Sequence, residues 1–295
     1  MKKTLFIGCV ESSYVLLEAM LKAGFVVAGI VTMEQSAINA DFKSLVPLAD
    51  EYNIPCICTK NVNDEETVGF IRKISPEVIY CFGWSRLIGK EILSIPKYGV
   101  VGFHPAALPC NKGRHPLIWA LVLGLSETAS TFFIMDEGAD TGDIISQEPV
   151  AISDTDDAAD LYAHVLEVAK EQVLEFTKAF AEDRVEPKKQ DSTAGNAWRK
   201  RGRMDGQIDW RMSAKAIYNL VRGLTHPYVG AHFMAGDAEI KVWKCQAIAT
   251  EDHANIEPGK IIKVNSNTDY IIKAYDGLVH ILDSDPVDLN EGEYL

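Results

Sequence analysis

Short runs of β-branched and aromatic residues alternate with longer amphipathic stretches over the first hundred residues of the chain. This alternation is typical of a parallel sheet whose strands are joined by covering helices. The predicted strands are Leu5–Gly8, Val26–Val31, Pro55–Cys58, Val78–Phe82 and Val100–Phe103, and the predicted helices are Ser12–Ala23, Ser44–Tyr52 and Glu65–Ile74. Ser12 is the expected N-cap of the first helix. We therefore expect an α/β domain with a doubly wound, mostly parallel sheet, which binds ligands beyond the carboxyl ends of its strands.

The pattern changes after residue 140. A strand over Ile144–Ile152 and a long helix over Asp157–Ala181 precede a polar stretch, Glu186–Asn196, whose Pro, Ser and Gly residues indicate a linker. Beyond it we expect a helix and then several short strands that Gly and Asn turns separate: Ser213–Val221 for the helix, and Glu239–Trp243, Gly259–Asn265, Thr268–Ala274 and Leu278–Leu282 for the strands. The predicted domains are 1–187, a linker 188–204, and a smaller β-rich domain of open-barrel, OB-like type over 205–295.

Composition and charge narrow the classes of function. The chain has 295 residues, 47% of them hydrophobic, and a formal net charge of −13, which repels polyphosphates, so no nucleic-acid partner is expected. The basic run Trp198–Arg203 is interpreted as a solvated loop. No long apolar run or signal-like start is present, so we expect a cytoplasmic protein without a membrane partner. The turn after the first strand lacks Gly-x-Gly-x-x-Gly, which argues against a dinucleotide-dependent oxidoreductase.

The six cysteines are expected to be reduced residues, several of them in the core, because no disulfide framework fits a chain of this length. Cys56 and Cys58 resemble half of a metal site. No second Cys or His pair follows at zinc spacing, so we predict no bound metal.

Two segments carry the candidate chemistry. His104 directly follows the strand Val100–Phe103, where Pro105 and Pro109 force an ordered turn. The segment Met135–Asp143 places two glycines and four acidic residues between apolar runs; its spacing does not fit a calcium loop. A carboxylate that faces an imidazole fixes its tautomer and stabilises its cation, so the two segments together favour acid/base catalysis.

These residues resemble a known family. The pattern His-x-x-x-Leu-Pro-x-x-x-Gly-x-x-Pro over residues 104–116, followed by Asp-x-Gly-x-Asp-Thr-Gly over 136–142, is similar to the formyltransferases that use 10-formyltetrahydrofolate. The later segment from Ile208 to Ala231 resembles the C-terminal domain of the methionyl-tRNA and nucleotide-sugar members. The resemblance implies a formyltransferase Rossmann-like domain and a catalytic pair, His104 and Asp140.

The resemblance also implies binding residues. Folate, as the formyl donor, would contact the loop before the catalytic strand and the loop that carries Asp140; the residues that occupy these places are Phe82, Gly83, Trp84, Arg86, Leu87, Ile88, Met135, Asp136 and Gly138. Side chains and helix N-termini at the same sheet edge are candidates for the acceptor, and a phosphate is expected near Lys112 and Arg114. The full set of acceptor candidates is Glu11, Ser12, Ser13, Asp41, Lys43, Ser44, Lys112 and Arg114.

One position departs from the family pattern. Two residues before the histidine the family has an asparagine whose amide helps to bind the formyl oxygen, and this chain has Gly102. Three replacements stay open: Asn111, a backbone N–H group, or protonated His104. Loss of one oxyanion donor costs a factor of about 10²–10³ in rate, so we expect a replacement donor in an active enzyme.

The acceptor predicted from these features is the amine of a nucleotide-linked amino sugar. The segment from Asn39 to Ser44 and the form Gly102-Phe-His-Pro are similar to formyltransferases that act on 4-amino-4,6-dideoxy hexoses of the pseudaminic or legionaminic type, with UDP as the expected nucleotide and GDP or dTDP as alternatives. The alternatives are a methionyl-tRNA formyltransferase, a folate hydrolase and a non-catalytic relative that binds folate or sugar nucleotide. A homodimer is a further expectation.

Overall fold

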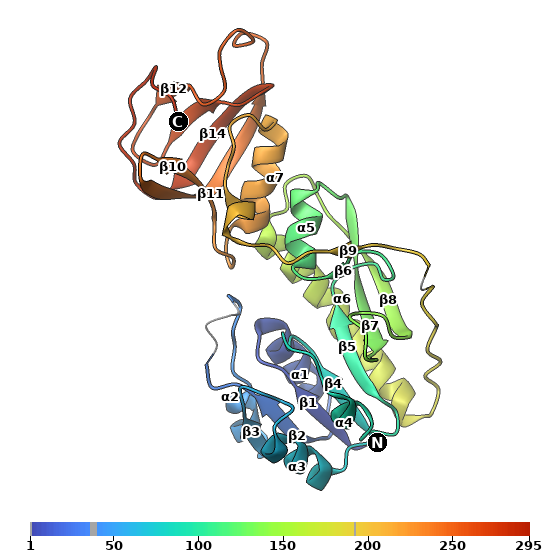
Figure 1. Ribbon diagram of the computed structural model, residues 1–295. Coiled ribbons are helices and arrows are strands. Elements are labelled where there is room, and N and C mark those ends of the chain that lie inside the picture. The colour runs from blue at the N-terminus through green and yellow to red at the C-terminus, as the bar shows by residue number, and fades with distance from the viewer. Residues whose placement is uncertain (1, 36–39, 192) are drawn as a thin grey trace. The chain divides into compact units, whose positions relative to one another are not determined.

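The chain forms two compact units in the computed structural model, which describes residues 2–35, 40–191 and 193–295. Figure 1 shows the course of the chain. The first unit contains Met1–Pro116, Thr128–Val150 and Ala163–Trp198, and the second contains Leu117–Glu127, Ala151–Tyr162 and Arg199–Leu295. Two segments that precede residue 187 therefore belong to the second unit, whereas the expected boundary assigned them to the N-terminal domain.

A seven-stranded sheet with the order β3-β2-β1-β4-β5-β7-β8 is the centre of the first unit. The five strands from β3 to β5 are parallel, and β7 runs antiparallel to β5. The strands are β1 Thr4–Ile7, β2 Val27–Thr32, β3 Cys56–Cys58, β4 Val78–Cys81, β5 Val100–His104, β7 Glu127–Ile134 and β8 Ile144–Ala151. The predicted mostly parallel sheet is thus confirmed.

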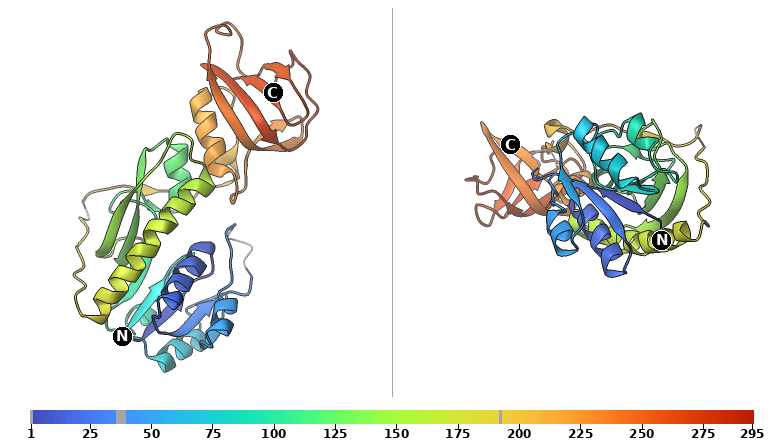
Figure 2. Two further views of the ribbon diagram at one scale, coloured as in Figure 1. Left: turned by 180° about the vertical axis from the view of Figure 1, so that it is seen from behind. Right: turned by 90° about the horizontal axis from the view of Figure 1, so that it is seen from below.

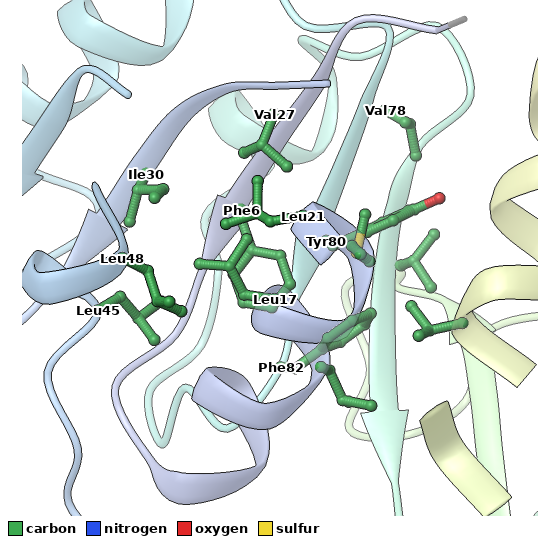
Figure 3. Packing of buried hydrophobic residues seen from close by; sticks show 14 of the residues in the cluster. Phe6, Leu17, Leu21, Val27, Ile30, Leu45, Leu48, Val78, Tyr80 and Phe82 are labelled. Atoms are coloured by element: carbon green, nitrogen blue, oxygen red, sulfur yellow. The ribbon is translucent and has the colours of Figure 1, made fainter. Parts of the chain in front are cut away.

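Helices cover both faces of this sheet, as the two views of Figure 2 show. The helices are α1 Glu11–Lys22, α2 Val46–Glu51, α3 Glu65–Ile74, α4 Lys90–Leu93 and α6 Ala158–Ala181, which begins in the second unit. Residues of α1, α2 and α6 pack with Phe6, Tyr80 and Phe82 in one apolar cluster, part of which Figure 3 shows. Residues of α3 and α4 form the cluster on the opposite face with Leu5, Ile7 and Ile79. Burial of these faces fixes the layered architecture.

The first helix begins one residue earlier than predicted, and Ser12 is not its cap. Val10 is the N-cap, and the hydroxyl of Ser13 accepts a hydrogen bond from the Val10 N–H group at 3.3 Å. The same hydroxyl donates to the carbonyl of Phe82 at 2.6 Å. A serine three positions after the cap satisfies the orphan N–H group and also ties this turn to the end of β4.

The second unit contains a five-stranded antiparallel sheet with the order β10-β11-β14-β13-β12. Its strands are β10 Ala231–Ala235, β11 Ala238–Ala249, β12 Ile261–Val264, β13 Tyr270–Lys273 and β14 Gly277–Ser284; its helices are α5 Pro116–Val122, which begins in the first unit, α7 Ala214–Leu224 and the 3₁₀ turn Arg203–Gly206. The predicted C-terminal β-rich domain is confirmed, and the sequence pattern missed β7, β10, α4 and α5.

The two early segments join the second unit through specific contacts. The buried guanidinium of Arg222 on α7 donates to the carbonyls of Ser153 and Asp156 at 3.0 and 2.9 Å. A Cβ atom at Gly223 would lie 3.2 Å from side-chain atoms of both Leu121 and Val122, so this glycine allows α5 to approach α7 closely. Among the described residues, no helix has both the length and the apolar character that crossing a bilayer requires.

Candidate active site

His104 is the last residue of β5, and its side chain is buried, with 5% of the residue exposed. Its Nε2 atom lies 2.8 Å from the carbonyl oxygen of Asn111. A carbonyl oxygen only accepts hydrogen bonds, so Nε2 carries a proton and donates it. This contact assigns the tautomer of the neutral ring and leaves Nδ1 as the atom that accepts or releases a proton.

Asp140 faces this free nitrogen. Its Oδ2 atom lies 3.7 Å from His104 Nδ1 and also accepts a hydrogen bond from the Gly113 N–H group at 2.9 Å. The backbone of Asp140 has a φ of 57°, in the left-handed region that aspartate tolerates better than most residues. The structure therefore brings together the two side chains that the sequence singled out, in a geometry suited to acid/base chemistry.

Side chains of the antiparallel strands hold the loop that follows His104. Thr131 on β7 donates to the carbonyl of Ala106 at 2.6 Å, and Gln147 on β8 donates to the carbonyl of Leu108 and to the Thr131 hydroxyl, both at 2.9 Å. The course of this loop at Ala106 and Leu108 thus depends on polar residues that the sequence pattern did not single out.

The loop that carries Asp140 is closed by its own polar groups. Asp136 Oδ1 accepts hydrogen bonds from the Gly138 N–H group at 2.9 Å and from the Thr141 hydroxyl at 2.6 Å. Gln190 donates through Nε2 to the carbonyls of Asp140 at 3.0 Å and Gly142 at 2.7 Å. Asp136 therefore shapes the loop, although the sequence assigned it to folate binding.

The segment predicted to be a linker is part of the same site. Gln190 contacts the Asp140 loop, and Asn196 Oδ1 accepts a hydrogen bond from the Asn111 N–H group at 2.8 Å. The short strands β6 (Lys112–Gly113) and β9 (Ala197–Trp198) pair in parallel. Polar composition typical of a linker gave no signal for these contacts, because an extended segment that pairs through its backbone needs no apolar alternation.

Gly102 is surrounded by apolar side chains. An ideal Cβ atom at this position would lie 2.8 Å from Phe133 Cζ and 2.9 Å from Met135 Cγ. Real Cβ atoms do not tolerate such distances, so any larger residue requires these two side chains to shift. The asparagine that the resemblance implies at this position would therefore not fit beside Phe133 and Met135 as they are packed here.

The loop that follows β4 is held in place by Asn63. Its side chain donates to the Leu87 carbonyl at 3.0 Å and accepts from the Gly89 N–H group at 2.7 Å. The side chains of Phe82 and Ile88 are buried in the core, whereas Leu87 is 71% exposed and Arg86 is also exposed. Hence Phe82 and Ile88 offer a ligand only their backbone atoms.

Gly83 and Trp84 complete this loop. Gly83 has a φ of 66°, and its carbonyl accepts a hydrogen bond from the Cys9 thiol at 3.5 Å. Trp84 packs against the apolar clusters of Cys9 and Ile88, and its buried Nε1–H group has no hydrogen-bond partner within the described part of the chain.

Some of the residues proposed to bind the acceptor lie close to one another. Glu11 and Lys43 form an ion pair at 2.9 Å, and the Glu11 N–H group donates to the carbonyl of Asp41 at 2.9 Å. Arg114 reaches the other loop through a 3.3 Å hydrogen bond to the Ser85 carbonyl. Lys112 extends from the short strand β6.

The three serines among these candidates are engaged or buried. Ser13 is fully buried and holds the first turn, and Ser12 is also buried. Ser44 accepts a hydrogen bond from the Val46 N–H group at the start of α2. Asn39, at the start of the segment that resembles the sugar enzymes, lies outside the described residues.

The basic run after residue 198 is solvated only in part: the side chains of Arg199 and Arg203 are 64% and 63% exposed. Arg201 is buried, its guanidinium lies 4.5 Å from the ring centre of Trp119, and burial lowers its pKa. Arg199 pairs with Asp205, Arg203 pairs with Glu239, and the Trp119 indole donates to the Arg199 carbonyl at 3.0 Å. The interpretation as a solvated loop therefore holds for Arg199 and Arg203 and is wrong for Arg201, because the sequence pattern could not show that Trp119 covers it.

No cluster of three or more His, Cys, Asp or Glu side chains suited to a metal ion occurs among the described residues. All six cysteines are free thiols; Cys9, Cys81 and Cys245 are buried and Cys110 is exposed.

Comparison with known proteins identifies the family. Residues 25–177 match the family model described as formyl transferase, and residues 202–288 match the formyl transferase C-terminal domain. A methionyl-tRNA formyltransferase of Caldanaerobacter subterraneus subsp. tengcongensis is 28% identical over 286 residues, which are 95% of this chain and 91% of the relative.

Solved structures of low identity share the fold. The N-formyltransferase from Helicobacter canadensis, in complex with folinic acid and dTDP-3-aminofucose, aligns with a TM-score of 0.70 at 19% identity over 96% of this chain and 100% of its own. WlaRD, a sugar 3N-formyl transferase solved in the presence of dTDP and 5-N-formyl-THF, aligns with a TM-score of 0.68 at 19% identity over 97% of this chain and 98% of its own. Because the first family model alone spans more than half of the 295 residues, the chain belongs to the formyl transferase family, whose members are enzymes that transfer formyl groups.

Proposed function

We propose that this enzyme transfers the formyl group of 10-formyltetrahydrofolate to the amine of a nucleotide-linked amino sugar, with a UDP-linked 4-amino-4,6-dideoxy-N-acetyl hexosamine as the acceptor of choice. The observation that carries the catalytic part is the pair of His104 and Asp140, with Nδ1 and Oδ2 3.7 Å apart at the end of β5. The family match supports the formyl group, and the acceptor rests on the arguments below.

The reaction defines what these residues must do. The neutral amine attacks the formyl carbon, a C–N bond forms, and negative charge develops on the formyl oxygen. The bond from the formyl carbon to folate N10 then breaks. The amine loses one proton and N10 gains one, so the overall reaction moves a formyl group in one direction and a proton in the other.

His104 is the proton carrier in this scheme. Because Nε2–H is committed to the Asn111 carbonyl, Nδ1 exchanges the proton, and Asp140 stabilises the ring when it is charged. We assign the role of the missing amide to the side chain of Asn111. The support is that its backbone is fixed on both sides, by the His104 ring at its carbonyl and by Asn196 at its N–H group.

The loop after β4 and the Asp140 loop are proposed to bind the folate donor. The exposed Leu87 offers an apolar surface to a pterin ring, and the Met135–Gly138 stretch offers backbone groups. An ion pair between Lys90 and Glu137, at 2.8 Å, connects the region after the first loop with the second loop. The neighbouring structures that contain folates support this choice of donor.

The sugar nucleotide is favoured over initiator tRNA by charge. The net charge of −13 repels a long polyanion. Within the second unit, Arg199 and Arg203 each pair with a carboxylate, and Arg201 is buried against Trp119. A single diphosphate requires only a few cations, which Lys112 and Arg114 supply on the loop that follows His104. The 28% identity to a methionyl-tRNA formyltransferase makes initiator tRNA the second candidate.

The test is an acceptor panel. The protein is incubated with 10-formyltetrahydrofolate and UDP-, GDP- and dTDP-linked 4-amino sugars or with methionyl initiator tRNA, while folate absorbance and product mass are followed. We expect a mass gain of one formyl group on a UDP-linked sugar. Formylation of the tRNA would show that initiator tRNA, and not a sugar nucleotide, is the acceptor. Release of formate would indicate a hydrolase. Binding without any absorbance change would indicate a non-catalytic relative.

A further inference from the structure

The strap, defined as residues 188–191 and 193–198, contacts both the loop that carries Asp140 and the loop that follows His104. At its start, the backbones of Lys188 and Ile144 exchange two hydrogen bonds of 2.7 and 2.8 Å. At its end, the Asn196 carbonyl accepts a hydrogen bond from the Lys112 N–H group at 3.1 Å, and β9 pairs with β6. The strap is therefore anchored both beside the Asp140 loop and beside the loop that follows His104.

Gln190 makes the central contacts of the strap. It is 8% exposed, and its Nε2 atom donates to the carbonyls of Asp140 and Gly142. Two carbonyl acceptors require the amide nitrogen at this position, so the orientation of the side chain is defined. Because Asp140 has a positive φ, these hydrogen bonds hold its backbone in a conformation that a non-glycine residue adopts at a cost.

The far end of the strap contacts the loop whose Asn111 carbonyl is hydrogen-bonded to His104. The carbonyl of Asn111 fixes the tautomer of His104, and the N–H group of the same residue donates to Asn196. A Cβ atom on Gly195 would lie 2.1 Å from the Pro109 carbonyl oxygen, so the strap passes directly against this loop, and glycine with a φ of 87° permits the approach.

We propose that Gln190 is a positioning residue for formyl transfer, which sets the distance between Asp140 and His104, and that Asn196 supports it by fixing the Asn111 peptide. The inference rests on the proposed function of the same site. Misplacement of a catalytic group by about 1 Å costs up to about 10²-fold in rate. In this proposal, the strap contacts prevent such a displacement of Asp140 relative to His104.

Three substitutions of Gln190 separate positioning from mere folding. Gln190→Glu keeps the shape but removes both N–H donors at neutral pH, Gln190→Ala removes the side chain, and Gln190→Lys restores N–H donors on a longer stem. We expect kcat to fall by about 10- to 100-fold in the Glu and Ala variants, with KM for donor and acceptor within about twofold, and a partial recovery in the Lys variant. Lys189→Ala, at an exposed strap position, is the matched control and should leave kcat unchanged.

A second measurement does not depend on turnover. In ¹⁵N-labelled protein without ligands, the Nδ1 and Nε2 shifts of His104 report its tautomer and its interaction with Asp140. We expect Gln190→Glu and Gln190→Ala to alter the Nδ1 shift and its pH dependence, and Asn196→Ala to alter the Nε2 shift, while Asn196→Asp, which retains an acceptor oxygen, stays close to wild type.

These readouts distinguish the two proposals. If no acceptor is formylated by the wild type, the proposed function fails, and the NMR shifts still test the positioning role. If folded Gln190 variants keep both the wild-type kcat and the wild-type His104 shifts, or lose activity only in proportion to their unfolded fraction, the positioning role is overturned. If the Ala variant does not fold, the isosteric Glu variant decides.

Discussion

The parallel half of the first unit and the polar framework beside it are built on different principles. The five parallel strands, β3, β2, β1, β4 and β5, lie between helices, and their buried residues belong to two apolar clusters. The framework consists of the loop after His104, the Asp140 loop and the strap, and it is held by side-chain amides, hydroxyls and backbone pairs. The first region determines where β5 ends, and the second supplies the groups that contact His104 and Asp140 at that end.

From this difference we expect the stability of the fold and the geometry of the His104–Asp140 pair to respond to different substitutions. Apolar burial is non-directional and tolerates modest changes of shape, whereas a hydrogen bond fixes distance and angle. We therefore expect substitutions in the parallel half to reduce stability, and substitutions in the framework to reduce turnover. The four predictions below test this division, beginning with the largest expected effect.

His104→Ala should lower kcat by about 10³-fold or more, because it removes the proposed proton carrier, which faces Asp140. The fold should persist, since His104 lies outside the apolar clusters that hold the sheet between its helices. Turnover and circular dichroism of the same sample provide the measurement. His164→Ala, at an exposed position of α6, is the control. Retention of turnover in His104→Ala would remove this residue from the mechanism.

Phe6→Ala should have the converse effect. Phe6 is completely buried on β1, and its ring makes an edge contact with Phe82 at a centroid distance of 5.3 Å. Removal of a buried phenylalanine side chain lowers the free energy of unfolding by about 3–5 kcal/mol. Urea unfolding measures this loss, and kcat per folded molecule should stay within about twofold of wild type. Val26→Ala, an exposed position before β2, should change little. A large fall in kcat at full folding would contradict the division between the two regions.

This contrast also explains what the sequence could predict. The periodicity around Phe6, Ile30 and Tyr80 predicted the parallel strands to within one or two residues, because burial on both faces leaves an apolar signal. The same reasoning selected His104 and Asp140, which the structure brings together.

The framework left no such signal. Gln190 and Asn196 lie in a polar stretch with the composition of a linker, and their partners are backbone groups that no side-chain pattern reveals. The partner of Arg201, Trp119, lies far away along the chain, so the sequence pattern did not show that this arginine is buried. Hydrogen bonds between distant segments become predictable only when the fold is known.

Gly102 lies between the parallel half and the polar framework, because β5 belongs to the sheet and ends at His104. We therefore expect Gly102→Ala to act mainly on stability. The added methyl group would clash with Phe133 and Met135, so we expect a loss of about 1–3 kcal/mol in the free energy of unfolding. A double-mutant cycle with Phe133→Leu provides the test. Phe133→Leu removes the ring atoms that the new methyl group would contact. The loss of unfolding free energy in the double variant should therefore be smaller than the sum of the losses in the two single variants. Strict additivity would show that the two side chains do not compete for this space.

Tyr80→Phe should have the smallest effect of the four substitutions. Tyr80 itself makes both apolar contacts and a hydrogen bond. The Tyr80 ring is part of the apolar cluster, and its hydroxyl lies 3.0 Å from Thr177 Oγ1 on α6. The Thr177 hydroxyl donates to the Val173 carbonyl, so Tyr80 is the donor in this pair. Loss of the hydrogen bond should lower the free energy of unfolding by about 0.5–1.5 kcal/mol at pH 7 without a change in kcat.

The pH dependence of the same variant tests the burial of that hydroxyl. Burial raises the pKa of Tyr80 above its usual value of 10.0, because the phenolate would lose its hydration. A group whose folded pKa is raised contributes stability that is fully present below its unfolded pKa and is lost as the pH rises above it. The stability of the wild type should therefore fall more steeply than that of Tyr80→Phe above pH 10, so that the difference seen at pH 7 narrows and then reverses. Urea unfolding of both proteins at pH 7, 10 and 11 measures this crossover, and parallel curves over that range would mean that the Tyr80 hydroxyl reaches water in the folded state.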